Sequence, residues 1–393
     1  MNSTPYGGGG RLAGAAAAVA ALALGLTALG AAADPRQALA SYLVAFVYWL
    51  GIALGALILL GAFHAAKARW PVVLRRFLET IPLTIPLFAV LFLPIAFGLR
   101  HLFVWADPAP LAGELLRAVE HKRPWLNAPF FLARAAFYFA LWTAVGALLR
   151  RWSVRQDEAG GHRLTAWQRR LGAGALPFLA LTLSFAAFDW MLSLEPRFAS
   201  TIFGVYWFAG SFLGAFAVLA VAAAVTRSHP DHFGHHLTAD HVHSLGKFLL
   251  AFTAFWAYIA FSQFMLIWIA NIPEELPWYL VRTGSSWGRV GLFLAVGHFL
   301  VPFGLLLSRD LKRDPRRLAW VAGWLLLVHY VDLYWIVMPR LHPAAPSPSW
   351  LDLTAFVGLG AAFLAALVFR MRGAATVPVR DPYLEESLRY RPQ

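Results

Sequence analysis

The sequence predicts an all-α polytopic membrane protein with about ten transmembrane helices, and three observations support this fold class. The 393 residues are 60% hydrophobic and only 13% charged, whereas a soluble domain is about 45–50% apolar and about 25% charged. The 17 Trp and 31 Phe residues fit a chain with extensive membrane interfaces, where aromatic side chains collect. Apolar runs of about 20 residues, the length that crosses a bilayer, recur along the whole chain.

The apolar runs predict two four-helix bundles with flanking helices. The ten runs cover residues 12–33, 41–66, 80–100, 128–149, 171–194, 200–226, 247–271, 287–308, 317–338 and 350–370. The run at 12–33, with a basic start and a small-residue end, also fits a cleaved signal peptide; we interpret it as a peripheral helix. Residues 41–194 form the first predicted bundle, residues 200–338 the second, and residues 371–393 a polar tail.

A short internal repeat supports this division. Asp189 is followed seven residues later by a Pro-Arg pair, and Asp332 is followed by a Pro-Arg pair at the same distance. Both acids lie near the outer ends of their helices, four helices apart. Duplication of a four-helix unit would produce this spacing, since parallel repeats are common in membrane folds.

The distribution of basic residues predicts the orientation. Of the 33 Lys and Arg residues, 23 flank one predicted face and 9 the other, which places both termini in the cytoplasm. The net charge of +13 is therefore assigned to basic membrane loops rather than to nucleic-acid binding. The outer connection 101–127 predicts a short amphipathic surface helix, and the tail is expected to wrap a neighbour or to stay mobile.

Polar side chains inside the apolar runs are the candidates for a proton pathway or a quinone pocket. A charge at mid-bilayer costs at least ~2.5–3.5 kcal/mol, and such groups usually face a bundle interior. The candidates are Arg134, Asp189, Tyr258, Ser262, Gln263, His298, His329 and Asp332.

Five of these candidates lie at a similar predicted depth. At 1.5 Å rise per residue, Arg134, Asp189, Gln263, His329 and Asp332 are ~8–15 Å below the outer boundary, so we expect them to share one polar pocket. Arg134 is the natural counter-charge of Asp189. His329 and Asp332 are three residues apart, share a helix face and form a candidate proton-handling pair. For each residue a structural ion pair is an equal alternative, but so many ionisable groups at one depth favour a function.

Two other segments bear on metal binding and on docking. The loop 227–247 holds six of the 13 His residues, but without a fixed ligand pattern, so we predict a solvated loop and no metal site. The absence of cysteine excludes thiolate-held iron–sulfur clusters, covalent c-type haem and disulfides in this chain. At 271–282, Glu274, Glu275, Trp278 and Tyr279 predict a membrane-edge loop, a proton exit or, as we prefer, a docking surface.

Two segments carry a resemblance to a known family. FDWMLSLEP at 188–196 and FWAYIAFSQFMLIWIANIPEE at 255–275 resemble the NrfD-like (polysulfide-reductase membrane-subunit) proteins of alternative complex III, a bacterial quinol:cytochrome c oxidoreductase. The resemblance covers nine of the ten runs and is closest to the ActF branch of this family. It implies two parallel four-helix bundles in the bacterial inner membrane.

The resemblance also implies function and partners. We expect a membrane subunit that supports menaquinol-linked electron transport and conducts or translocates protons, with Asp189, His329 and Asp332 lining the route. This chain is expected to hold no metal and no catalytic residue; the iron–sulfur clusters and c-haems belong to a periplasmic iron–sulfur subunit and to cytochrome subunits. Other implied partners are the paralogous quinol-site membrane subunit and a terminal oxidase. The alternatives are a direct quinol-binding subunit, a purely structural anchor and a secondary transporter.

Overall fold

The computed structural model describes residues 6–230, 232–273 and 275–391, and within these residues the chain forms helices and no strands. Ten helical segments are long and apolar enough to cross a membrane, which confirms the predicted fold class. They are α1 (Gly10–Ala33), α2 (Pro35–Ala65), the broken segment Val72–Phe97, α8 (Ala128–Ala159), α9 (Arg163–Trp190), α10 (Phe203–Thr226), α11 (Ala239–Ala270), the broken segment Trp287–Leu307, α16 (Pro315–Val337) and α17 (Trp350–Met371).

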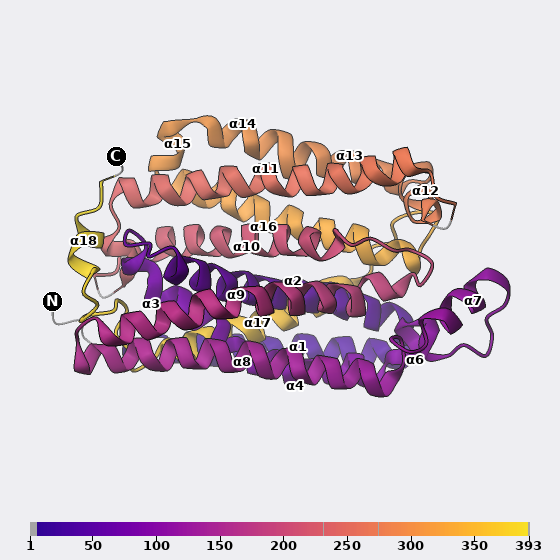
Figure 1. Ribbon diagram of the computed structural model, residues 1–393, viewed down its shortest axis with the longest axis horizontal. Helices are drawn as coiled ribbons and strands as arrows, with labels where there is room; N and C mark the ends of the chain where they lie inside the picture. Colours follow the sequence, from indigo (N-terminus) through magenta and orange to yellow (C-terminus); the bar gives the residue numbers. More distant parts are fainter. Residues whose placement is uncertain (1–5, 231, 274, 392–393) are drawn as a thin grey trace.

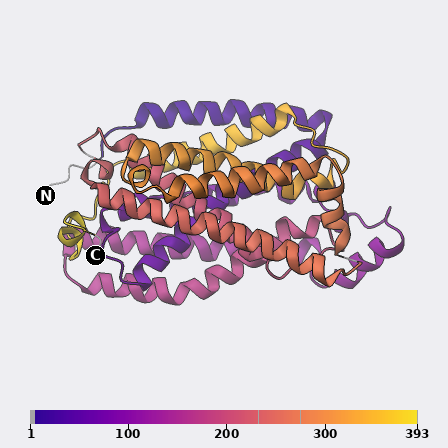
Figure 2. The same ribbon diagram turned by 90° about the horizontal axis from the view of Figure 1, so that it is seen from above.

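Helix α2 lies at the centre of the molecule. It packs against α9 on one side, against α10 and α16 on the other, and against α17. Helices α8 and α9 pack together, and α10 packs against both α11 and α16. Helix α1 packs on α17 and α2 at the edge of the assembly, as Figure 2 shows. Its outward side chains, such as Leu22 and Leu29, are among the most exposed in the chain.

The third membrane segment is broken, unlike the continuous run predicted at 80–100. It consists of α3 (Val72–Thr80), a 3₁₀ turn (Ile81–Thr84), α4 (Ile85–Leu91) and α5 (Leu93–Phe97). Prolines 82, 86 and 94 lack the amide hydrogen that a continuous helix needs, which explains the breaks. The segment also begins eight residues earlier than predicted, so it includes buried charged residues near its start.

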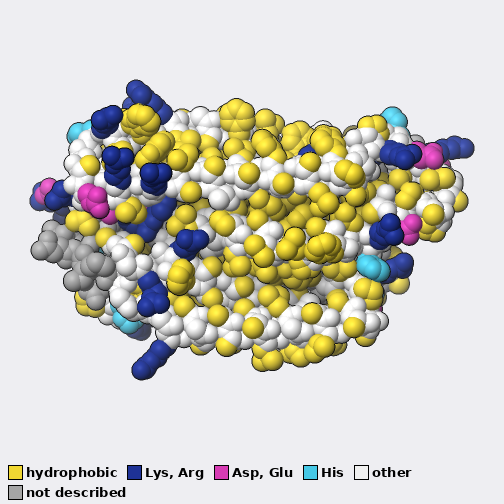
Figure 3. Space-filling model, turned by 90° about the horizontal axis from the view of Figure 1, so that it is seen from below, with side chains coloured by type: hydrophobic (Ala, Val, Ile, Leu, Met, Phe, Trp, Pro, Cys, Tyr) yellow, Lys and Arg dark blue, Asp and Glu magenta, His cyan; other side chains and the backbone are white. Residues whose placement is uncertain are grey.

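The first residue of α1 and the last helix, α18 (Leu384–Leu388), lie at the same end of the molecule, which we name the terminal end (Figure 1). The opposite end carries α7 (Gly113–Lys122), which confirms the helix predicted in the 101–127 connection. Figure 3 shows an apolar middle, with Lys and Arg side chains gathered at both ends and most densely at the terminal end. The orientation in a membrane stays a prediction.

The C-terminal tail packs against its own chain, which corrects the expectation that it wraps a neighbour or stays mobile. The buried Asp381 forms an ion pair with Arg75 of α3. The Ser387 hydroxyl accepts a hydrogen bond from the amide of Val73 at 3.1 Å and donates one to the carbonyl of Trp70 at 2.7 Å. The tail therefore caps the start of the third membrane segment.

Candidate functional site

The first polar cluster surrounds Asp189, near the end of α9. We define it as Trp125, Arg134, Tyr138 and Asp189. Arg134 on α8 donates from Nε to Oδ2 at 2.9 Å and from Nη2 to Oδ1 at 2.7 Å, which confirms the predicted ion pair. The Tyr138 hydroxyl and the Trp125 indole donate to the same carboxylate, both at 3.0 Å. Asp189 is fully buried, and its charge is neutralised and hydrogen-bonded as burial requires.

Arg134 is itself held on several sides. Its Nη1 donates to the Trp125 carbonyl at 3.0 Å. Its guanidinium lies 4.1 Å from the centroid of the Trp125 ring and 4.3 Å from that of Phe130, distances at which a cation is attracted to an aromatic face. The first cluster is therefore saturated with contacts and suits a structural role.

The second polar cluster surrounds Asp332 on α16. We define it as Tyr206, Trp256, His298, His329 and Asp332. The Tyr206 hydroxyl donates to Oδ1 of Asp332 at 2.5 Å, and the Trp256 indole donates to Oδ2 at 3.0 Å. Nδ1 of His329 lies 3.8 Å from Oδ2. The His298 ring centroid lies 3.8 Å from that of Trp256 and 6.1 Å from that of His329.

The second cluster contains unpaired polar atoms. Within the described residues, both ring nitrogens of His298 and both of His329 are buried and have no hydrogen-bond partner. Leaving such a group unpaired costs ~1–3 kcal/mol each, and in a native protein it marks a place for water, an ion or chemistry. An imidazole nitrogen can either donate or accept a hydrogen bond, so this cluster offers four open positions for water or for a transferred proton.

The backbone positions both histidines. His298 lies in a π-helical turn, Ala295–Leu300, between α13 (Trp287–Leu294) and α14 (Val301–Leu307). Pro302 lacks the amide hydrogen that would bond to the carbonyl of residue 298 in an α-helix, and π-turns occur frequently at functional sites. His329 packs on α10, where a Cβ atom on Gly210 would lie 2.7 Å from its Nδ1.

The two clusters correct the prediction of one shared pocket. The first lies where α8 and α9 meet, and the second lies among α10, α11, α16 and the π-helical turn that carries His298. Among the described residues no hydrogen bond joins the clusters. The rings of Trp190 and Trp207, with centroids 6.2 Å apart, pack between α9 and α10. The polar residues of the two clusters were predicted at similar depths in the membrane. The depth of a residue along its helix, however, does not specify which neighbouring helix its side chain faces.

The remaining candidates on α11 lie outside both clusters. Gln263 is buried, donates to the Tyr279 hydroxyl at 3.2 Å and accepts from Ser200 at 3.1 Å, so it joins the short helix after α11 to the loop before α10. Tyr258 is 65% exposed on the outer face of the helix. Ser262 is half-buried and makes no hydrogen bond with a described residue. Gln263 therefore does not share a pocket with the acids as expected, and roles for Tyr258 and Ser262 stay predictions.

In the segment after α11, Trp278 and Tyr279 are packed into the protein and are not free to bind a partner, whereas residues 271–273 are exposed and docking there stays a prediction. Glu274 lies outside the described residues, and Glu275 directly precedes α12 (Leu276–Gly284). Trp278 and Tyr279 are each only 7% exposed, and Trp278 stacks on the ring of Phe198 at 4.7 Å.

Arg282 on α12 anchors this segment. Its side chain donates to the carbonyls of Trp335 and Ile336, at 3.2 and 2.6 Å, in the last turn of α16, where carbonyls lack partners within the helix. Burial lowers the pKa of Arg282 to about 9, against the raising effect of Glu195. Arg282 thus positions the end of α16 that follows Asp332.

A cavity of about 690 Å³, which we name the side cavity, lies beside the second cluster. Tyr206 and Trp256, the two donors to Asp332, are among its lining residues. Phe261 and Leu292, which also line it, are 61% and 67% exposed on the outer surface of the helices. The side cavity therefore connects the donors of the second cluster with the surface that faces lipid in a membrane.

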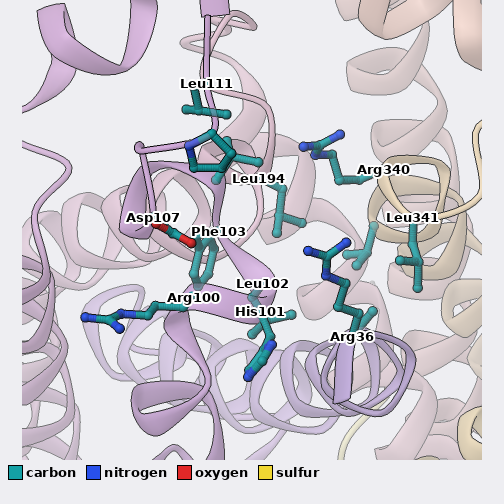
Figure 4. A pocket seen from close by; sticks show the side chains of 14 residues that line it. Arg36, Arg100, His101, Leu102, Phe103, Asp107, Leu111, Leu194, Arg340 and Leu341 are labelled. Carbon is teal, nitrogen blue, oxygen red and sulfur yellow. The ribbon is translucent and has the colours of Figure 1, made fainter. Parts of the chain in front are cut away.

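A second cavity, of about 260 Å³, lies at the α7 end (Figure 4). Arg36 and Arg340 point into the same space, whereas Arg100 points away from it. Asp107 is the one acidic residue in its lining. Neither this cavity nor the loop 227–247 gathers metal ligands: the described part of the chain has no group of three or more His, Asp or Glu residues placed to hold a metal ion.

Comparisons with known proteins identify no relative of this chain. Neither a family model nor a curated protein matches this chain. The chemistry of the site is therefore argued from its own geometry.

Sequence reasoning missed Tyr138, Trp125, Tyr206 and Trp256, since aromatic residues in apolar helices carry no signal that separates a hydrogen-bond donor from ordinary core packing.

Proposed function

We propose that this chain is a membrane subunit of a respiratory quinol:cytochrome c oxidoreductase of the alternative complex III type, and that its second cluster conducts protons. One observation carries the proposal: the buried carboxylate of Asp332 lies beside two imidazoles whose four ring nitrogens have no partner among the described residues. Such a group of ionisable side chains within a membrane segment is costly and typical of proton relays.

The geometry supports a relay. Tyr206 lines the side cavity, and its hydroxyl donates to Asp332. When the Tyr206 oxygen accepts a proton from the side cavity, the hydroxyl passes its own proton to Asp332, so the tyrosine stays neutral. His329, 3.8 Å from the carboxylate, is the next acceptor after a small side-chain movement or through one water. The first cluster takes no part in this proposal, because the Asp189 carboxylate already accepts hydrogen bonds from Arg134, Tyr138 and Trp125.

The resemblance of two segments to the NrfD-like proteins favours a respiratory complex. In this proposal iron–sulfur and c-haem subunits carry the electrons, and this chain needs no redox centre of its own. The proposal places the chain in a bacterial inner membrane beside the paralogous quinol-site subunit.

The side cavity favours a second candidate function, direct binding of a quinol such as menaquinol. Its volume lies within the ~300–1,000 Å³ typical of ligand sites. A head-group hydroxyl can donate to the Tyr206 oxygen, while an isoprenoid tail leaves between Phe261 and Leu292 into lipid. Oxidation releases two protons and two electrons; the second cluster accepts protons, and the electrons must pass to a partner subunit.

Substitution of Asp332 tests the proton proposal. In the assembled complex in proteoliposomes, Asp332→Asn is expected to lower the number of protons moved per electron, while quinol-driven reduction of cytochrome c persists. The matched control is Asp189→Asn, since Asp189 is equally buried but paired with Arg134; once assembled, that variant should keep the proton ratio. An unchanged ratio in Asp332→Asn would exclude proton conduction through the second cluster.

Filling the side cavity tests the quinol proposal. Ala260 lines the cavity, whereas Ala251 lies on the exposed face of the same helix. Ala260→Phe is expected to weaken binding of a quinone analogue at least tenfold, and Ala251→Phe should leave it unchanged. Equal binding by the two variants would exclude the cavity as the quinol site without affecting the proton proposal.

A further inference from the structure

A basic cavity of about 190 Å³ lies at the terminal end, apart from both polar clusters. It is formed where α2 ends, α3 begins and α9 begins, and Tyr383 of the tail forms part of its wall. Its charged and titratable lining consists of His64, Lys67, Arg69, Arg75, His162 and Arg169. No acidic side chain lines it. We name this space the basic cavity.

Part of the positive charge is unneutralised. Arg75 is paired with Asp381 and Glu79, and Arg69 is paired with Glu386 at 2.9 Å. Lys67 and Arg169 form no ion pair with any described residue. The basic cavity therefore keeps at least two positive charges that an anionic ligand can neutralise.

The start of α9 adds hydrogen-bond donors. This 28-residue helix has no side-chain cap at His162 and no acidic residue in its first turn, so its first amide groups lack partners and its positive dipole end is uncompensated. Thr165 and Ala166 of that turn line the basic cavity. Helix starts of this kind bind phosphate groups.

His64 is an independent indication of a ligand. It lines the basic cavity, is only 6% exposed, and its Nε2 has no hydrogen-bond partner among the described residues. A polar atom buried without a partner normally marks an unseen ligand or water. The cavity is several times larger than the ~30 Å³ that one water occupies, so it has room for a phosphate group.

The surrounding residues place the basic cavity at the membrane surface. Trp167, one residue beyond the lining residue Ala166, is 46% exposed and packs edge-on against Trp152 at 5.6 Å. Exposed tryptophans of this kind lie at the level of lipid head groups. Basic pockets between membrane helices are suited to anionic phospholipid head groups.

We propose that the basic cavity binds the phosphate group of an anionic phospholipid, with Lys67 and Arg169 as its cationic contacts and the first turn of α9 as its amide donors. A soluble phosphate ester has the same recognition chemistry. The position of Trp167 favours the lipid.

The test uses the full chain, purified in detergent and stripped of lipid. Cardiolipin, phosphatidylcholine and inorganic phosphate are added separately, and the melting temperature and the bound mass by native mass spectrometry are recorded. The test variant is the double substitution Lys67→Gln/Arg169→Gln. The matched control is Arg151→Gln/Arg155→Gln, because both arginines are exposed at the same end, outside the basic cavity.

Cardiolipin is expected to raise the melting temperature and to be retained by the wild type and the control, with at least a tenfold loss of affinity in the test variant. Phosphatidylcholine should bind all three proteins equally weakly. If inorganic phosphate alone reproduces the shift, and the test variant loses it, the site is a phosphate site supplied from solution. Equal cardiolipin binding by the test and control variants, or no binding by the wild type, would overturn the proposal.

Discussion

The guanidinium of Arg134 binds both carboxylate oxygens of Asp189, at 2.7 and 2.9 Å, inside the helix bundle. Asp332 in the second bundle region also accepts one tyrosine and one tryptophan hydrogen bond, but no arginine. Each acid thus accepts one hydrogen bond from a tyrosine and one from a tryptophan, but only Asp189 is also bound by an arginine. That difference is why the proton proposal uses Asp332 and not Asp189.

The Arg134–Asp189 pair should contribute strongly to stability. Arg134→Met leaves Asp189 as an unpaired buried charge, which costs about 3–5 kcal/mol, and a large fall in melting temperature in detergent is expected. The double variant Arg134→Met/Asp189→Leu removes both charges and should recover most of that loss. A double variant no more stable than the single one would contradict this account of the pair.

Gly210 should be essential for the position of His329. Gly210→Ala forces a methyl group to within 2.3 Å of the His329 ring, so we expect a lower melting temperature and loss of proton conduction in the assembled complex. The matched control is Gly323→Ala on α16, where a Cβ atom meets no heavy atom within 4 Å and alanine favours a helix by ~1 kcal/mol. Equal behaviour of the two variants would exclude a positioning role for Gly210.

The apolar pattern predicted every membrane-length helix, because a backbone in lipid must satisfy its hydrogen bonds within a helix. The same pattern predicted the Arg134–Asp189 pair, because a buried charge needs a counter-charge. It did not predict how the polar groups divide into two clusters. That division depends on the rotation of each helix about its axis, to which ordinary packing residues such as Trp190 and Trp207 contribute.

The buried aromatic hydrogen-bond donors could not be identified from the sequence for a related reason. Tyr206 and Trp256 occupy apolar helices, and a tyrosine or tryptophan in such a helix usually serves packing or the membrane interface. Tyr258, two residues from Trp256, was predicted in the pocket, yet it points outward while Trp256 reaches Asp332. Residues two positions apart on a helix differ by about 200° in direction, and the sequence does not specify which of them faces the core.

Asp381 should hold the C-terminal tail on α3. Asp381→Asn removes a buried ion pair with Arg75, and we expect faster trypsin cleavage at Arg380 and Arg389. Glu385→Gln is the control, since its pair with Arg389 is 76–78% exposed and such surface pairs contribute about 0–1 kcal/mol. Equal cleavage rates for the two variants would show that the tail does not depend on the buried pair.

Glu195 should make stability depend on pH. It lies just beyond the end of α9, and burial raises its pKa above the ordinary value of about 4.5, although Arg340, Arg282 and Arg197 oppose the shift. A raised pKa means that the folded state holds the proton more tightly than the unfolded state. The stabilisation is therefore complete below the ordinary pKa and is lost as the pH rises through the raised value.

Melting temperatures measured from about pH 4 to about pH 8 test this expectation. The wild type should lose stability relative to Glu195→Gln as the pH rises, because glutamine cannot ionise. Glu114→Gln is the matched control: Glu114 also pairs with a nearby arginine, Arg197, but its side chain is 76% exposed, so its removal should leave the pH profile unchanged. A wild-type profile parallel to that of Glu195→Gln would mean that burial of this carboxylate does not set the pH dependence.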